Sequence, residues 1–394
     1  MSTDYVPAAE VRPEVFTSRA ADHIQRGAQR GRELRTGIDS AIAGYRRYFA
    51  FLSLAEADVR AAASASHARL QEWSPEAAEE VAAVAEAAGV SIDELTEVIA
   101  RTEIMTLAPA AATECSTVSF TRPGASIAAQ NWDWAADFST LWHINDSGSV
   151  PGQLRHVGIA EYGMLGKIGL NEAGVGVLLN ILKHEGDGPG GVPIHMILER
   201  VLSKATTMDE ALEIIHSAQA SSSSIITVVT ADEVVQVEIA NSKKRERRAG
   251  SSCESPRAES SSGFLLHTNH FLHHDLVPGG LELNATSTSR ARLAHLEGRT
   301  EECPSRAEDH SGGTEDHSGR GGRSGEPEST ADLIDLLTTG PGEAPVSCTP
   351  APGAAYGDRS ATLVTVQIDP ARRQIDLAPG SPADGMDRNR RYRL

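Results

Sequence analysis

The stretch that decides the fold is residues 114–134, E-C-S-T-V-S-F-T-R-P-G-A-S-I-A-A-Q-N-W-D-W. Two β-prone runs separated by the turn signal R-P-G-A predict a β-hairpin with one strand on each side of the turn. The returning strand would bring Asn131 and Asp133 back to the end of the hairpin at which Cys115 lies. We therefore expect a thiol, a carboxylate and an amide close together, and we expect the rest of the chain to serve this cysteine.

The composition of the chain indicates a globular protein and excludes several classes of partner. Its 394 residues are enough to bury a hydrophobic core without disulfides. A net charge of -18 argues against binding to nucleic acid or to an anionic membrane, because both require clustered Lys and Arg. The first residues carry neither the basic nor the apolar part of a signal peptide, and the four cysteines are widely spaced. A cytoplasmic protein without nucleic-acid or membrane partners is expected.

The order of sequence patterns predicts two regions with different secondary structure. Residues 1–114 carry apolar residues at helical spacing and a capping box at Ser91, so this region is expected to be mostly helical. Residues 115–394 alternate β-prone runs with amphipathic helices, which predicts an α+β fold of packed layers. Two segments rich in Ser, Gly and charged residues, 241–262 and 300–330, are expected to be disordered insertions.

Cys115 is the first candidate for chemistry. Cysteines are often small buried hydrophobes, but this one begins a strand and is followed by an acid and an amide on a hairpin, which favours a nucleophile. Trp132 and Trp134 flank Asp133, and such a pair rarely arises from core packing alone because a buried carboxylate needs a partner. The two indoles are expected to bind substrate. The alternative is a surface carboxylate beside two half-buried rings.

The segment H-T-N-H-F-L-H-H has two interpretations. Its four histidines, His267, His270, His273 and His274, could bind a metal, although no cysteine or acidic residue nearby completes a known ligand spacing. Alternatively, Asn269 provides a side-chain amide that donates to a developing oxyanion, or it simply forms a turn. No metal is predicted, and a histidine-cluster metal-binding protein is the alternative from another functional class.

Two more polar stretches are candidates for binding. Arg359, in D-R-S-A-T-L ahead of a predicted strand, could hold Asp133 or a substrate carboxylate, or it could be an exposed loop residue. Ser223 lies in a run of serines ahead of another strand and could line a substrate pocket or belong to a loose loop. The sequence contains no glycine-rich phosphate loop, so neither a nucleotide nor another cofactor is predicted.

Several motifs occur in the order found in one known family. They are G-A-Q-R-G from Gly27, R-T-E-I from Arg101, C-S-T from Cys115, Q-N-W-D-W from Gln130, G-K-I-G-L-N-E-A-G-V from Gly166, G-V-P from Gly191, H-T-N-H from His267 and R-S-A-T-L from Arg359. Through them the chain resembles, over most of its length, the isopenicillin N acyltransferase family, also called acyl-coenzyme A:6-aminopenicillanic acid acyltransferases. Those enzymes are self-processing N-terminal-nucleophile (Ntn) hydrolases. The resemblance implies a four-layer αββα sandwich with a helical N-terminal prefix.

The resemblance also implies that the chain cuts itself. Cys115 matches the residue that becomes a new N-terminus when its bond to Glu114 is cleaved, which would divide the chain into segments 1–114 and 115–394 that stay together. The chemistry is coherent from the residues upward. A thiol with a pKa of about 8.5 is mostly protonated at pH 7, and a free α-amino group on the same residue, with a pKa of about 7.7–8.0, can act as its base.

Other roles follow from the same resemblance. Asp133 matches the acid near the nucleophile, Asn269 the oxyanion amide and Arg359 the arginine that orients the acid. Two positions depart from the family. Asp358, a candidate for substrate binding, replaces a functionally important serine, and Glu114 replaces a glycine at the cleavage site.

The expected function is hydrolysis or transfer of an acyl group through an acyl-enzyme on Cys115. The substrate is expected to be an amide or thioester of a small molecule or peptide-like metabolite, with acyl-coenzyme A as the co-substrate of the alternative, an acyl-coenzyme A-dependent N-acyltransferase. An unprocessed homologue that only binds ligand is a further alternative, which Glu114 and the two expected insertions suggest.

Overall fold

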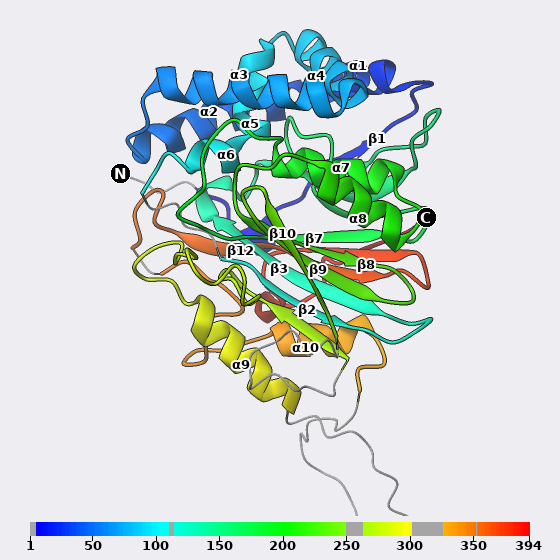
Figure 1. Cartoon of the computed structure of the whole chain (residues 1–394), viewed down its shortest axis with the longest axis vertical. Helices are drawn as coiled ribbons and strands as arrows, with labels where there is room; N and C mark the ends of the chain where they lie inside the picture. Colours follow the sequence, from blue (N-terminus) through cyan, green and yellow to red (C-terminus); the bar gives the residue numbers. More distant parts are fainter. Residues whose placement is uncertain (1–4, 110–113, 250–262, 302–325, 352) are drawn as a thin grey trace, which may run out of the picture.

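Two β-sheets pack face to face between layers of helices in the computed structural model, which describes residues 5–109, 114–249, 263–301, 326–351 and 353–394 (Figure 1). Helices of the N-terminal region, together with α7 and α8, cover one side, and α9 and α10 cover the other. The N-terminal helices are α1 (His23–Glu33), α2 (Arg35–Phe51), α3 (Glu56–Trp73), α4 (Pro75–Ala88), α5 (Ile92–Ile99) and α6 (Arg101–Met105). They are followed by α7 (Ile194–Lys204), α8 (Met208–Ser217), α9 (Ser289–Glu301) and α10 (Thr330–Leu337). The predicted α+β sandwich with αββα layers is confirmed.

The two sheets are built almost entirely from antiparallel strands. The first has the order β1-β4-β5-β6-β7-β8-β9-β10, in which only β1 and β4 run parallel, and the second has the order β11-β2-β3-β12-β13-β14. The strands of the first sheet are β1 (Val15–Thr17), β4 (Trp142–Asp146), β5 (His156–Glu161), β6 (Ile168–Asn171), β7 (Gly176–Ile181), β8 (Ser224–Val229), β9 (Val234–Ala240) and β10 (Lys243–Arg248). Those of the second are β2 (Ser116–Phe120), β3 (Ile127–Ala135), β11 (Phe264–His267), β12 (Ser360–Asp369), β13 (Gln374–Pro379) and β14 (Arg390–Arg393).

The predicted hairpin forms the middle of the second sheet. Strands β2 and β3 pair with Ser116 opposite Asn131, while β11 and β12 flank them. The returning strand is longer than the sequence suggested and continues to Ala135. Every residue of β3 is buried, because the first sheet covers one face and α10 the other, so the polar residues of Q-N-W-D-W are held inside the molecule.

Glycines allow the helices of the N-terminal region to pack closely. A Cβ atom on Gly27 of α1 would lie 2.5 Å from the carbonyl oxygen of Glu80 in α4, and one on Gly31 would lie 2.4 Å from that of Val84. An alanine at either position would therefore force the two helices apart. The predicted capping box at Ser91 is also present and begins α5.

Two features differ from the expectations, and part of a third expectation concerns residues that the structure does not describe. Strand β1 adds residues 15–17 of the N-terminal region to the first sheet, so this region is not only helical. The expectation of disorder at 241–262 is wrong for Lys243–Arg248, which form β10 by pairing along β9. The remainder, 250–262, and most of the second expected insertion, 302–325, lie outside the described residues. Among the helices that the structure describes, none is both long enough and apolar enough to cross a membrane.

Candidate active site

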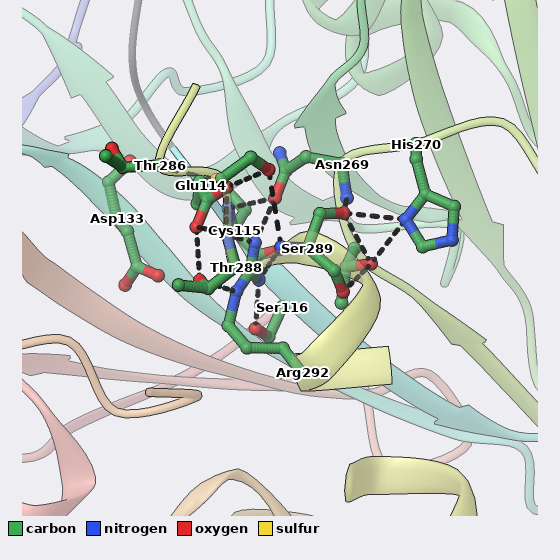
Figure 2. A network of polar contacts seen from close by, with 12 residues as sticks. Glu114, Cys115, Ser116, Asp133, Asn269, His270, Thr286, Thr288, Ser289 and Arg292 are labelled. Carbon is green, nitrogen blue, oxygen red and sulfur yellow. Dashed lines mark hydrogen bonds and ion pairs between the residues drawn. The ribbon is translucent and has the colours of Figure 1, made fainter. Parts of the chain in front are cut away.

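Cys115 lies directly before β2 and is almost completely buried, with 3% of its surface exposed. Its Sγ lies 3.8 Å from the carbonyl oxygen of Asp133, so the predicted closeness of thiol and acid-bearing strand is confirmed. The backbone nitrogen of Cys115 donates to Oδ1 of Asn269 at 2.8 Å. Its carbonyl oxygen accepts from Nη1 of Arg292 at 2.7 Å and from Nδ2 of Asn180 at 3.1 Å. Figure 2 shows Asn269 and Arg292 converging on the backbone of Cys115.

Asn269 reaches Cys115 because β11, which ends two residues earlier, pairs with β2. Its Oδ1 accepts from the Cys115 nitrogen and from Nη2 of Arg292 at 2.8 Å, so its amide nitrogen must face away from both. That nitrogen donates to the carbonyl of Ile181 at 2.9 Å. A primary amide carries two hydrogens, so the second is available to an oxyanion. Ser289 fixes the position by accepting from the Asn269 backbone nitrogen at 2.7 Å.

Asp133 is buried and only partly hydrogen-bonded. Its Oδ1 accepts from Oγ1 of Thr362 at 2.6 Å, while Oδ2 has no partner among the residues that the structure describes. Burial raises the pKa of the Asp133 carboxyl well above its usual value. Burial, reinforced by this neighbouring acid, raises the pKa of the Cys115 thiol to about 12. In the intact chain the thiol therefore keeps its proton. The expectation that the Asn131 amide joins the thiol and the acid is wrong, because its nitrogen donates to the carbonyl oxygens of Leu337 and Val346.

The interpretation of Arg359 as the arginine that holds Asp133 is wrong. Its Nη1 pairs with Asp137 at 3.2 Å and its Nε donates to the carbonyl of Ala354 at 2.8 Å. The reason is the strand register, which places Thr362 of β12, and not Arg359, opposite Asp133. Asp358 is exposed in the loop before β12.

Arg292 is a residue of this candidate site that the sequence did not reveal. It lies on α9, 177 residues after Cys115, and is completely buried. Besides its bonds to Cys115 and Asn269, it donates to Oγ of Ser116 at 2.7 Å and lies 3.3 Å from the carboxylate of Glu114. Nothing in the local sequence S-R-A-R separates it from Arg290. Asn180, at the end of β7, was also missed.

A cavity of about 440 Å³ opens beside this centre. Two predicted substrate-binding residues, Trp134 and Ser223, line it, as does Ile181, whose carbonyl holds Asn269. Its apolar lining includes Met105, Leu107, Ile181, Leu182, Leu281 and Leu283. Trp132 is not part of the lining, since its ring lies 3.6 Å from Nζ of Lys167.

The four histidines do not form one metal site. His267 is buried against Glu238 at 2.9 Å, and Nδ1 of His270 lies 2.7 Å from Oγ of Ser289. Within the described part of the chain, the only grouping close enough to hold a metal is His273, His274 and Asp275. This grouping is separate from the Cys115 centre, so the geometry gives the metal-binding alternative no support there.

Comparison with known proteins identifies relatives of this chain. The acyl-coenzyme A:6-aminopenicillanic acid acyl-transferase family model matches residues 120–319. The acyl-coenzyme A:6-aminopenicillanic-acid-acyltransferase 40 kDa form of Emericella nidulans is 30% identical over 229 residues, which are 58% of this chain. The chain spans about three fifths of that relative's length, 60%.

Solved structures give more distant similarities. An N-acylethanolamine-hydrolyzing acid amidase ortholog from Caenorhabditis elegans matches 71% of this chain and 100% of its own, with 15% identity and a TM-score of 0.41. Penicillin V acylase from Agrobacterium tumefaciens matches 67% of this chain and 82% of its own, with 14% identity and a TM-score of 0.34. The family model covers just over half of the 394 residues, and the motifs around Cys115 occur in the same order, so the chain belongs to the acyl-coenzyme A:6-aminopenicillanic acid acyl-transferase family.

Proposed function

We propose that this protein is a self-processing amidohydrolase or acyltransferase that forms an acyl-enzyme on Cys115 after the bond from Glu114 is cut. One observation carries the proposal. The Cys115 nitrogen, which cleavage would turn into a free amine, lies 2.8 Å from the buried Oδ1 of Asn269 and on the same residue as the thiol. A base and a nucleophile would thus be held together without a catalytic histidine. Family membership supports acyl-transfer chemistry at this site.

Self-cleavage would use the groups that surround the intact bond. The Cys115 thiol adds to the carbonyl carbon of Glu114, the carbon–nitrogen bond breaks, and the nitrogen leaves as an amine that carries the thiol's proton. Water then opens the resulting thioester and restores the thiol. Oδ1 of Asn269 can accept from the nitrogen both as an amide and as an amine. Asn180 and Arg292 hold the Cys115 carbonyl and keep the backbone in place meanwhile.

Turnover would repeat the first step on a substrate. The α-amino group, with a pKa of about 7.7–8.0, accepts the thiol proton as the sulfur adds to the substrate carbonyl. The free hydrogen of the Asn269 amide would stabilise the oxyanion, and the cavity beside Trp134 would hold the apolar part of the substrate. The acyl group then passes to water or to an amine.

The two fragments are expected to remain bound to each other. Strand β1 pairs with β4, and Arg101 of α6 forms a buried ion pair with Glu161 of β5 at 2.8 Å. Both contacts join the segments on either side of the cleavage site.

An intact-mass measurement of the purified protein tests the proposal. We expect two chains, 1–114 and 115–394, and a single uncut chain from the Cys115→Ala variant. A single full-length wild-type chain that nevertheless hydrolyses amides would refute it.

The transferase alternative differs only in the acyl donor and acceptor. The name of the Emericella relative pairs acyl-coenzyme A with 6-aminopenicillanic acid, which motivates the test. Product analysis with a simple acyl-coenzyme A and an added primary amine separates the two. A new amide would favour transfer, whereas the free acid alone would favour hydrolysis.

A further inference from the structure

The intact chain presents one acyl group to its own nucleophile, namely residue Glu114. The carbon that Cys115 would attack is the Glu114 carbonyl, and the side-chain carboxylate lies four carbons further along. This carboxylate is not free in solvent, because only 15% of the Glu114 side chain is exposed. The structure therefore shows what binds the side-chain carboxylate of the residue before the nucleophile.

Two residues directly before α9 and one in its first turn hold this carboxylate, and we call Ser287, Thr288 and Arg292 the carboxylate clamp. Oε1 of Glu114 accepts from Oγ of Ser287 and from the Thr288 nitrogen at 2.9 Å. Oε2 accepts from Oγ1 of Thr288 and lies 3.3 Å from Nη2 of Arg292. Burial alone would raise the pKa of Glu114, but Arg292 and these donors outweigh it and lower the pKa. The clamp thus favours an ionised carboxylate, as a helix N-terminus also does.

The clamp is connected directly to the backbone of the nucleophile Cys115. Arg292 donates to the Cys115 carbonyl, to Oγ of Ser116 and to Oδ1 of Asn269, each within 2.8 Å (Figure 2). Because one rigid guanidinium touches both the carboxylate and the nucleophile's backbone, the distance between the clamp and Cys115 is fixed. An acyl group of the wrong length could not reach both.

We propose that the carboxylate clamp is the acyl subsite of the processed enzyme, and that it selects acyl groups with a carboxylate four carbons beyond the carbonyl. Glutaryl amides and N-acyl-glutamyl amides have this chemistry. The inference rests on the proposed function, because the same thiol attacks Glu114 in self-cleavage and the substrate in turnover. The sulfur–carbon bond forms as the carbon–nitrogen bond breaks, and the amine leaves with the thiol's proton. Water then releases the dicarboxylic acid.

Protection of Cys115 from alkylation tests the clamp without requiring turnover. The full, self-cleaved protein is treated with iodoacetamide in glutarate or in pentanoate, which has the same five carbons but lacks the second carboxylate. Intact mass measures the alkylated fraction. We expect glutarate to slow alkylation at least about fivefold at concentrations where pentanoate has no effect. The 4-nitroanilides of the two acids should differ in kcat/KM by about tenfold or more, since a hydrogen bond to a charged group is worth that factor.

Matched variants separate the loss of carboxylate binding by the clamp from a nonspecific effect of substitution. Thr288→Val keeps the side-chain shape but removes the hydroxyl donor, and it should lose most of the glutarate protection. Arg290→Ala is the control, because the Arg290 side chain is 72% exposed and pairs with Glu282. Equal protection by glutarate and pentanoate in a cleaved protein, together with equal anilide rates, would overturn the clamp and leave the proposed function standing. An uncut wild-type chain would instead sink the proposed function itself.

Discussion

Two buried arginines contact the Cys115 hairpin from different elements, and they differ in whether their carboxylate partner is permanent. Arg101 of α6 pairs with Glu161 at 2.8 Å and lies 4.0 Å from the ring of Trp134. Lys167 pairs with the same carboxylate at 2.8 Å, so two buried cations hold Glu161. Arg292 pairs with Glu114, which under the proposed cleavage becomes the end of a separate chain.

The difference indicates what each arginine is for. A buried charge without its partner is costly, so a permanent pair such as Arg101–Glu161 serves to hold the fold together. Under the proposed cleavage, Arg292 and Glu114 belong to different fragments, so a substrate carboxylate can take the place of Glu114. We therefore expect changes at Arg101 to alter stability and changes around Arg292 to alter reaction rates.

The largest expected effect follows from breaking the permanent pair. Arg101→Ala leaves the buried Glu161 with only Lys167 and the Tyr45 hydroxyl as partners, and it should lower the free energy of unfolding by about 3–5 kcal/mol. Urea denaturation measures this loss. Arg69→Ala is the control, because both side chains of the Arg69–Glu72 pair are exposed, 49% and 66%, and this pair should be worth about 1 kcal/mol or less. Similar losses in both variants would show that burial does not distinguish these arginines.

The second prediction concerns the Arg292–Glu114 pair. Arg292→Lys keeps the positive charge but removes the planar guanidinium. The single ammonium of lysine cannot match the spacing of the two terminal nitrogens with which Arg292 reaches the Cys115 carbonyl, Asn269 and Glu114. Self-cleavage should therefore slow by about a hundredfold while the protein stays folded. A time course of intact mass gives the rate, and circular dichroism checks the fold. The exposed Arg290→Lys variant should cleave normally. Cleavage of Arg292→Lys at the wild-type rate would contradict the role assigned to the guanidinium.

A third buried carboxylate, that of Glu103, differs from Glu161 and Glu114 because its hydrogen-bond donors are neutral groups. The Ile194 nitrogen donates to it at 3.0 Å and Oγ of Ser222 at 2.8 Å, and burial raises its pKa to about 7. The folded protein thus retains a proton that the unfolded chain releases near pH 4.5. The stability due to this proton is complete below pH 4.5 and is lost as the pH rises through 7.

The consequence can be measured as a pH slope. The free energy of unfolding should fall between pH 5 and pH 8 by up to about 3 kcal/mol more in the wild type than in Glu103→Gln, which cannot titrate. Urea denaturation of both proteins at the two pH values provides the difference. Parallel slopes would show that Glu103 titrates normally.

The sequence was sufficient where neighbouring residues determine the structure. The hairpin, the closeness of Cys115 to Asp133 and the capping box at Ser91 all follow from patterns within about twenty residues. Asn269 could also be located, because the strand before it was recognisable and its family motif was intact. The layer order followed from the resemblance together with the alternation of strands and helices.

The sequence was insufficient where side chains meet across long separations. Arg290 and Arg292 look alike, and only the packing of α9 against β11 turns one to solvent and the other to Cys115. Arg359 was assigned to Asp133 because strand register cannot be read from a single strand, and the observed register gives that place to Thr362.

The smallest expected effect tests whether self-cleavage depends on the charge of the Glu114 side chain or only on its shape. Glu114→Gln keeps the length of the side chain but replaces one acceptor with an amide nitrogen, which would face the donors of Ser287 or Thr288. Losing one hydrogen bond to a charged group should slow self-cleavage by about tenfold, as followed by intact mass. Glu282→Gln is the control, because Glu282 is an exposed carboxylate that pairs with Arg290. If Glu114→Gln is cut as fast as the wild type, the clamp does not use the charge of Glu114 in cleavage. Its preference for an ionised acyl group would then have to come from Arg292 acting on the substrate alone.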